Sequence, residues 1–324
     1  MMKEFFRTMA HTLHDGIRIL QGGGGGLMWK ARYIRNCLSK GDTAFLFFTD
    51  AHWGENYRIS PAIMKYLAER TGIRNVFFCG DLITHSDPSK ESMKSLARDF
   101  VREFRIDGCE FFPLFGNHDD NSYEQADPEA VFSMSELDEV YPVYGASSAY
   151  EAGTYYYYVD DDRHRIRYIC LNTAKQKYVD YRQLKFVLNA LMMSKPDSRI
   201  VIFGHIWVEW DRVARKYFPN AKTGMLLNLF DAFNACRRFG RYDFSACTSR
   251  IILVMGGHIH NEYMTFTAGG IPVILNDSDS FAKSCNRKRI IPYRQSVSAV
   301  IVQSDAIRVI KFGRGISRKI TRRI

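Results

Sequence analysis

Residues 44–52 read AFLFFTDAH, an uninterrupted apolar run that ends at an aspartate and a histidine. An apolar run of this length is typical of a strand that is buried on both faces of a parallel sheet. Four more segments repeat the arrangement, each with an apolar run followed by glycine and by residues that can bind a metal ion. They are 75–81 (NVFFCGD), 110–119 (EFFPLFGNHD), 199–205 (RIVIFGH) and 251–260 (IILVMGGHIH).

Helices are predicted between these strands and hairpins after them. Residues 28–39, 61–70 and 90–104 read as helices, and this alternation of strand and helix predicts an α/β fold with a partly parallel sheet. Three hairpins are predicted in the second half, at 155–159 with 166–171, at 262–266 with 272–275 and at 298–302 with 307–312. They predict a second, more antiparallel sheet. We expect the two sheets to pack face to face, with helices outside.

The chain is expected to form one sizeable domain with an extension at each end. Its 324 residues, 46% of them hydrophobic, are enough to bury one large core. Residues 22–26 are five consecutive glycines, whose high backbone entropy predicts a flexible link after a loosely attached N-terminal helix. The chain is therefore divided into an N-terminal helical, glycine-rich extension (1–42), a main domain (43–312) and a basic C-terminal tail (313–324).

The positive charge is concentrated near the C-terminus. The whole chain has a formal charge of +10, whereas residues 283–324 contain twelve Lys and Arg against one Asp, which leaves about −1 for the rest. A basic segment of this kind can attract nucleic acid or another polyanion. The alternative is a solvated terminal strand and tail, which the scarcity of interleaved aromatic residues after Phe312 favours.

Several functional motifs are absent from the sequence. The seven cysteines form no CxxC pair, which argues against a disulfide framework and a zinc ribbon, and a cytoplasmic setting is expected. No cysteine has an arginine six positions on, and neither GxxxxGK[ST] nor GxSxG occurs, so covalent catalysis by Cys or Ser has no motif. No run reaches the roughly 18 apolar residues of a membrane span. The sequence shows no sign of an obligate protein partner.

The residues after the five apolar runs predict a metal centre. Ligands of open α/β sheets bind beyond the carboxyl ends of the strands, so the five segments should converge on one crevice. The available donors are Asp50, His52, Asp81, Asn117, His118, His205, His258 and His260. Nitrogen and oxygen donors without a thiolate favour borderline divalent ions such as Mn, Fe or Zn. Because the donors exceed what one ion takes, two ions that share a carboxylate are expected.

The motifs DxH, GD, GNHD, GH and GHxH, in this order between residues 43 and 262, resemble the calcineurin-like metallophosphoesterase superfamily. The segment 49–54 (TDAHWG) and the closing stretch 307–318 (IRVIKFGRGISR) resemble a bacterial and phage branch of it. The resemblance implies a four-layer sandwich of two mixed β-sheets flanked by helices, with a dinuclear metal site at the carboxyl ends of the strands.

The resemblance also implies a role for each motif residue. One metal ion would be held by Asp50, His52, Asp81 and His260. The other would be held by Asp81, Asn117, His205 and His258, with Asp81 bridging the two ions. His118 would stand beside the ions as a catalytic residue.

The expected activity is hydrolysis of a phosphate ester, a monoester or a diester, by a hydroxide held between the two ions. His118 would protonate or stabilise the leaving oxygen, and Asp119, the second predicted catalytic residue, would hold its imidazole. The alternatives are a nuclease or nucleotide phosphodiesterase that uses the basic C-terminus, a protein phosphatase, a phosphatase of small molecules or lipid precursors, and a binding module with a vestigial metal site.

Some aromatic and polar residues near these motifs could line the mouth of the site. They are Trp53, Asn56, Tyr57, Arg58, Asn121, Tyr123, Trp207 and Trp210. Aromatic side chains there would suit a base or a sugar. The same residues could equally belong to the core at the rim of the sandwich.

Overall fold

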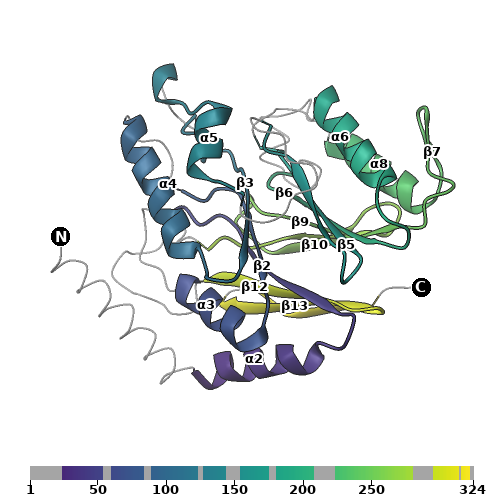
Figure 1. Cartoon of the computed structure of the whole chain (residues 1–324), viewed down its shortest axis with the longest axis horizontal. Helices are drawn as coiled ribbons and strands as arrows, with labels where there is room; N and C mark the ends of the chain where they lie inside the picture. The colour runs from purple at the N-terminus through teal and green to yellow at the C-terminus, as the bar shows by residue number, and fades with distance from the viewer. Residues whose placement is uncertain are drawn as a thin grey trace.

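Two six-stranded sheets form the centre of the protein (Figure 1). The computed structural model describes residues 24–53, 60–83, 89–122, 127–143, 154–174, 180–207, 223–279, 295–313 and 315–321. The first sheet contains, in spatial order, β14 (Arg318–Thr321), β13 (Ala306–Gly313), β12 (Ser296–Val302), β1 (Thr43–Phe48), β2 (Asn75–Cys79) and β3 (Glu110–Leu114). The second contains β10 (Tyr263–Phe266), β11 (Pro272–Leu275), β9 (Arg250–Gly256), β6 (Arg199–Gly204), β5 (Ile166–Leu171) and β4 (Tyr157–Asp161). A small hairpin joins β7 (Arg238–Phe239) and β8 (Tyr242–Asp243).

Both sheets are mixed. Strands β1, β2 and β3 are parallel in the first sheet, and β5, β6, β9 and β11 are parallel in the second. Antiparallel strands complete them: β12, β13 and β14 extend the first sheet beyond β1, and β4 and β10 form the edges of the second. The expectation of a second, more antiparallel sheet is therefore wrong. The three hairpins do form, but the local pattern of a hairpin does not specify which distant strand it joins, and the 298–312 hairpin pairs with β1.

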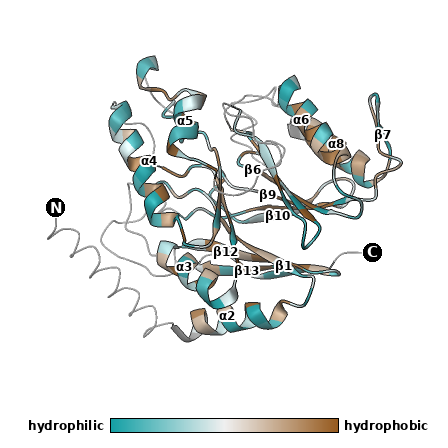
Figure 2. Ribbon diagram, viewed as in Figure 1, coloured by the Kyte–Doolittle hydropathy of each residue, from teal (hydrophilic) through white to brown (hydrophobic). Residues whose placement is uncertain are grey.

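The alternation of side chains along each strand builds a core on both faces of the sheets. On β1, Phe45 and Phe47 point between the sheets, whereas Leu46 and Phe48 face the helices. Phe77 of β2 stacks on Phe203 of β6 with 4.3 Å between ring centroids, which joins the two sheets. Figure 2 shows the resulting distribution, with hydrophobic strands inside and helices that turn hydrophilic residues outward.

Helices cover the outer face of each sheet. Those over the first sheet are α2 (Gly24–Cys37), α3 (Ser60–Thr71), α4 (Lys90–Phe104) and α5 (Met134–Val140), with the short 3-10 turn η1 (Pro128–Ala130) before α5. Those over the second are α6 (Tyr181–Met192) and α8 (Thr223–Asn234). The predicted four-layer sandwich of two mixed sheets flanked by helices is confirmed (Figure 1).

The glycine run was expected to be a flexible link, but helix α2 begins at Gly24, so residues 24–26 lie in its first turn. The N–H groups of a first turn have no partner within the helix, so glycine is tolerated there. Farther along, Ala31 and Ile34 are buried in the core and hold the helix on the sheet. The predicted helix before the run lies outside the described residues.

The C-terminal segment contributes to the first sheet. Strand β14, which falls in the predicted basic tail, pairs antiparallel with β13. The division of the chain into extension, domain and tail stays a prediction.

Among the helices that the structure describes, none is long and apolar enough to cross a membrane.

Candidate metal centre

Side chains from both sheets meet at the carboxyl ends of their parallel strands. One group consists of Asp50 and His52 after β1, Asp81 after β2 and His260 after β9. A second group consists of Asp81 again, His205 after β6 and His258 after β9. Within each group the potential ligand atoms all lie within 4.8 Å of one another. Asp81 belongs to both groups, so the arrangement suits two ions that share one carboxylate.

The backbone at these positions is in an unusual conformation. Left-handed φ angles occur at Asp50 (52°), His52 (45°), Asp81 (51°), His258 (73°) and His260 (53°). Residues other than glycine rarely adopt this region, and such strain is concentrated at functional sites. The chain therefore turns sharply after β1, β2 and β9.

Two of the motif glycines leave room for ligand side chains. A Cβ atom on Gly80 would lie 2.5 Å from Nδ1 of His205, and one on Gly116 would lie 2.0 Å from Oδ1 of Asp81. Gly80 also has a φ of 81°. Any larger residue at either position would displace a group of the cluster.

Two carboxylates are buried at the centre of the cluster. Asp50 is 0% and Asp81 1% exposed. Burial would raise the pKa of Asp50, but the nearby His205 and His260 outweigh it and hold this pKa at about 2. The pKa of Asp81 is likewise far below its usual range, because the neighbouring histidines outweigh burial. The cluster thus carries two negative charges that need positive partners.

The histidines respond to these carboxylates in different ways. Burial opposes protonation of His205, yet Asp81 and Asp50 raise its pKa to about 10. Its Nε2 lies 3.2 Å from Oδ2 of Asp81, while Nδ1 donates to the carbonyl oxygen of Cys79 at 2.7 Å. That hydrogen bond fixes the ring so that Nε2 faces the cluster. For His52, burial wins and the pKa falls to about 4, so its imidazole is neutral near pH 7.

Three buried atoms of the cluster are poorly satisfied. Oδ1 of Asn117 has no hydrogen-bond partner among the described residues, and Oδ2 of Asp81 and Nε2 of His205 have none there except each other, at 3.2 Å. Asn117 itself lies between Gly116 and His118, whose backbones both contact Asp81. Buried polar atoms are nearly always well paired, so atoms with so few partners on three predicted ligands favour a cation at this place. The donor set therefore fits divalent metal ions.

The two predicted catalytic residues occupy different places. His118 faces the cluster, with Nε2 3.8 Å from Oδ2 of Asp81. Asp119 is fully buried, and its oxygens accept hydrogen bonds from the backbone amides of Leu82 (2.7 Å), Ile83 (3.3 Å) and Gly116 (2.7 Å). The carboxylate thus ties the loop after β3 to the loop after β2. The role of Asp119 in holding the imidazole of His118 stays a prediction.

Of the residues expected near the mouth, the described ones belong to the core. Trp207 is 1% exposed and donates from Nε1 to the carbonyl oxygen of Met255. Trp53 packs on Phe104 of α4, and Asn121 is fully buried. The other five residues of that set lie outside the described residues. The prediction that they line the substrate site is therefore wrong for Trp207 and Asn121, because both side chains are buried in the core.

Sequence reasoning missed two hydroxyl groups that hold Asp50. Oγ1 of Thr49 donates to Oδ2 of Asp50 at 2.6 Å, and Oγ of Ser278 donates to the Asp50 carbonyl oxygen at 3.2 Å. Ser278 follows β11, which is parallel to β9, so it also lies beyond the carboxyl end of a parallel strand. The rule that ligands bind beyond the carboxyl ends of parallel strands would also have pointed to Ser278. It was not applied there because residues 272–275 were expected to pair only in an antiparallel hairpin.

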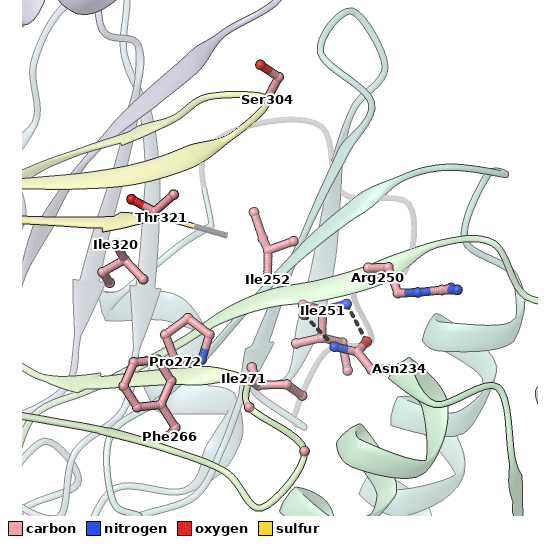
Figure 3. Close-up of a pocket in the computed structure, with 12 residues that line it drawn as sticks. Asn234, Arg250, Ile251, Ile252, Phe266, Ile271, Pro272, Ser304, Ile320 and Thr321 are labelled. Atoms are coloured by element: carbon pink, nitrogen blue, oxygen red, sulfur yellow. Dashed lines mark hydrogen bonds between the residues drawn. The ribbon is translucent and has the colours of Figure 1, made fainter. Parts of the chain in front are cut away.

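A hollow of about 990 Å³ opens at the opposite end of the sandwich (Figure 3). Its walls include Ile252 of β9, Pro272 of β11 and Ile320 of β14, and Asn234 beside it is hydrogen-bonded to Ile251. Strand β9 runs from this hollow to the histidines, a length of about 20 Å at the usual rise per residue. The hollow is therefore separate from the metal centre.

Known proteins share both the motifs and the fold. Residues 43–262 match the family model of the calcineurin-like phosphoesterases. The chain resembles a dimetal phosphatase from zebrafish (Danio rerio), with 14% identity, a TM-score of 0.55 and coverage of 86% of this chain and 98% of that one. It also resembles the purple acid phosphatase PPD1 from yellow lupin (Lupinus luteus), with 13% identity, a TM-score of 0.56 and coverage of 87% and 54%. No curated protein matches the sequence at a significant level. The chain therefore belongs to the calcineurin-like phosphoesterase family and is a phosphoesterase enzyme.

Proposed function

We propose that this protein hydrolyses phosphate esters with two divalent metal ions. One ion would be held by Asp50, His52, Asp81 and His260, and the other by Asp81, Asn117, His205 and His258. The observation that carries the proposal is the pair of ligand groups that share Asp81. Their buried oxygen and nitrogen atoms, which have few hydrogen-bond partners, support it. When bound, the ions supply positive charge for the phosphate oxygens and a water that ionises near neutral pH.

The protein's own residues would then orient the ester and move protons. The His118 side chain is 14% exposed and borders the cluster, and its ring meets His52 edge to face at 4.8 Å. It is therefore placed to give a proton to the leaving oxygen of a bound ester. Asp119 would serve this step by fixing the loop that carries His118, through its hydrogen bonds to backbone amides.

Manganese, iron or zinc are the ions that we propose, because the donors are imidazole, carboxylate and amide. The cytoplasmic setting is proposed from the cysteine pattern of the sequence.

Polyanion binding through the basic C-terminus gains no support from the described residues. Lys311 is 2% exposed, Arg318 bonds Glu262 and Arg308 bonds Tyr33, which leaves Lys319 as the one exposed basic residue among those described in this segment. We therefore do not propose a nuclease on that ground.

A metal reconstitution assay tests the proposal. Chelated protein would be reloaded separately with Mn, Fe, Zn, Co or Ni and assayed against a phosphomonoester, a phosphodiester, a cyclic nucleotide and DNA. At least one ion should restore hydrolysis of at least one ester, and the panel also identifies the ester class.

Two variants separate the ligand role from the catalytic role. Asp81→Asn should lose both bound metal and activity, whereas His118→Gln should keep its metal and lose rate. His164→Gln is the control, since His164 pairs with Asp161 outside the cluster. Full activity in both cluster variants, or activity in the chelated enzyme, would contradict the assignment.

A further inference from the structure

The closing stretch, residues 307–318, lies beside the loop that carries two of the proposed ligands. It contains most of β13 and the first residue of β14, and the glycines at 313 and 315 lie in or next to the turn between these strands. Nothing in the proposed chemistry uses this hairpin directly. Besides its pairing with β12, it contacts Glu262, at one end of segment 256–262, and Asn276, which bonds Gly256 at the other end. This segment holds His258 and His260.

On the C-terminal side of the segment, the turn contacts Glu262, whose side chain is only 11% exposed. Oε1 of Glu262 accepts from Nε of Arg318 at 3.0 Å, and Oε2 accepts from the Ile316 amide at 2.7 Å. Gly315 has a φ of 95°, and a Cβ atom there would lie 2.3 Å from Oε2. Glycine at this position therefore allows the turn to approach the carboxylate.

On the N-terminal side of the segment, the contact is made by Lys311 of β13, which is 2% exposed. Its Nζ donates to Oδ1 of Asn276. The backbone N–H of Asn276 in turn donates to the carbonyl oxygen of Gly256 at 2.8 Å, two residues before His258. The hairpin thus contacts the histidine segment directly at one end and through the residue Asn276 at the other.

The histidine segment needs such support because its backbone is unfavourable. His258 and His260 have φ angles of 73° and 53°, which persist only where the surrounding structure holds them. The side chain of His260 is also 42% exposed, so packing alone restrains it less than the other members of its group.

We propose that the β13–β14 hairpin is a brace that positions His258 and His260 for metal binding, with Glu262 as the positioning residue nearest to His260. The proposal rests on the metal-binding function proposed above. It predicts that breaking the contact to Glu262 weakens the ion held by His260 without unfolding the protein. Outer partners of metal ligands typically change affinity about 10- to 100-fold when they are removed.

Calorimetric titration of metal-free protein with Mn²⁺ measures this effect independently of activity. The wild type should bind two ions, and Glu262→Ala should bind the weaker-held ion about tenfold or more less tightly. Arg318→Gln keeps the amide hydrogen bond to Glu262 and should cause a smaller loss. Glu139→Ala is the matched control, because it removes a similar bond to Arg98 between α4 and α5, and its affinities should equal those of the wild type.

Electron paramagnetic resonance provides a second measurement. At two equivalents of Mn²⁺, the wild type should give the signal of a coupled pair, and Glu262→Ala should show more uncoupled ion. Equal affinities and equal spectra in the wild type, Glu262→Ala, Arg318→Gln and Glu139→Ala would overturn the brace and leave the proposed function intact. A wild type that binds fewer than two ions would overturn the proposed function itself. Arg318→Gln decides alone if Glu262→Ala does not fold.

Discussion

Metal uptake by the metal-free protein should release protons in a number that the structure specifies. His205 has a pKa of about 10, raised by Asp81 and Asp50 against the effect of burial, so near pH 7.5 nearly every molecule carries that proton. A metal ion binds neutral imidazole, so it must displace this proton. His52, with a pKa of about 4, has none to lose at that pH.

The expected number of released protons follows from His205 and His52 and from a third histidine, His260. The pKa of His260 is raised, because its hydrogen bond to the Asp50 carboxylate and the charges of Asp50 and Asp81 outweigh burial, so this imidazole adds to the release. We expect at least about one proton per protein at pH 7.5, and fewer than the four that all four proposed histidine ligands would release if each were charged. Below pH 9 the apparent affinity should rise about tenfold or more per pH unit.

Calorimetry in buffers with different ionisation enthalpies counts the released protons. Titrations with Mn²⁺ in HEPES and in Tris at pH 6.5, 7.5 and 8.5 give both the count and the slope of affinity with pH. His164→Gln should behave as the wild type, because its imidazole lies outside the cluster. Binding that releases no proton at pH 7.5, with an affinity that is flat over this range, would refute the electrostatic account of the site.

Three further changes test the packing of the site and the core. Gly116→Ala should weaken metal binding and lower the free energy of unfolding by about 1–3 kcal/mol, because the new Cβ would lie 2.0 Å from Oδ1 of Asp81. Denaturant titration measures this loss. Gly26→Ala, whose Cβ would meet no atom within 4 Å, is the control and should show no such loss. Phe77→Ala should lower the unfolding free energy by about 3–5 kcal/mol in urea, because this ring is fully buried between the sheets, and a loss below about 1 kcal/mol would contradict that position. Asp119→Asn should cost the metal-free protein about 1–3 kcal/mol by thermal unfolding, because its amide nitrogen cannot accept from a backbone amide; an unchanged Tm would refute this role.

Local signals in the sequence were enough to predict most of the site. Each metal-binding motif follows a buried strand directly, so the strand end and the ligand are read from the same few residues. The rule that parallel strands collect ligands at their carboxyl ends then brings distant motifs together. That reasoning predicted the neighbourhood of Asp50, Asp81 and His205, which the structure places within one cluster.

Contacts between distant segments were beyond the same reasoning. Nothing in the local pattern of residues 298–312 tells which strand they pair with, and they joined β1 rather than the second sheet. For the same reason the local pattern does not indicate that Glu262 and Lys311 are largely buried against partners far away in the chain. The neighbours of Asp119 in the sequence likewise do not reveal that it accepts hydrogen bonds from the distant amides of Leu82 and Ile83.

The division of the ligands between the two sheets couples cation uptake to the assembly of the sandwich. Asp50 and Asp81 come from the first sheet and His205 and His258 from the second, so neither half supplies all the proposed ligands of an ion. An ion bound between the two sheets stabilises only the state in which the sheets are packed together. At a free ion concentration of a hundred times Kd, this raises the free energy of unfolding by about 2.7 kcal/mol. A chelator should therefore weaken the packing of the two sheets on each other more than the pairing of strands within each sheet. Amide hydrogen exchange should accelerate first at the carboxyl ends of the strands that carry the proposed ligands.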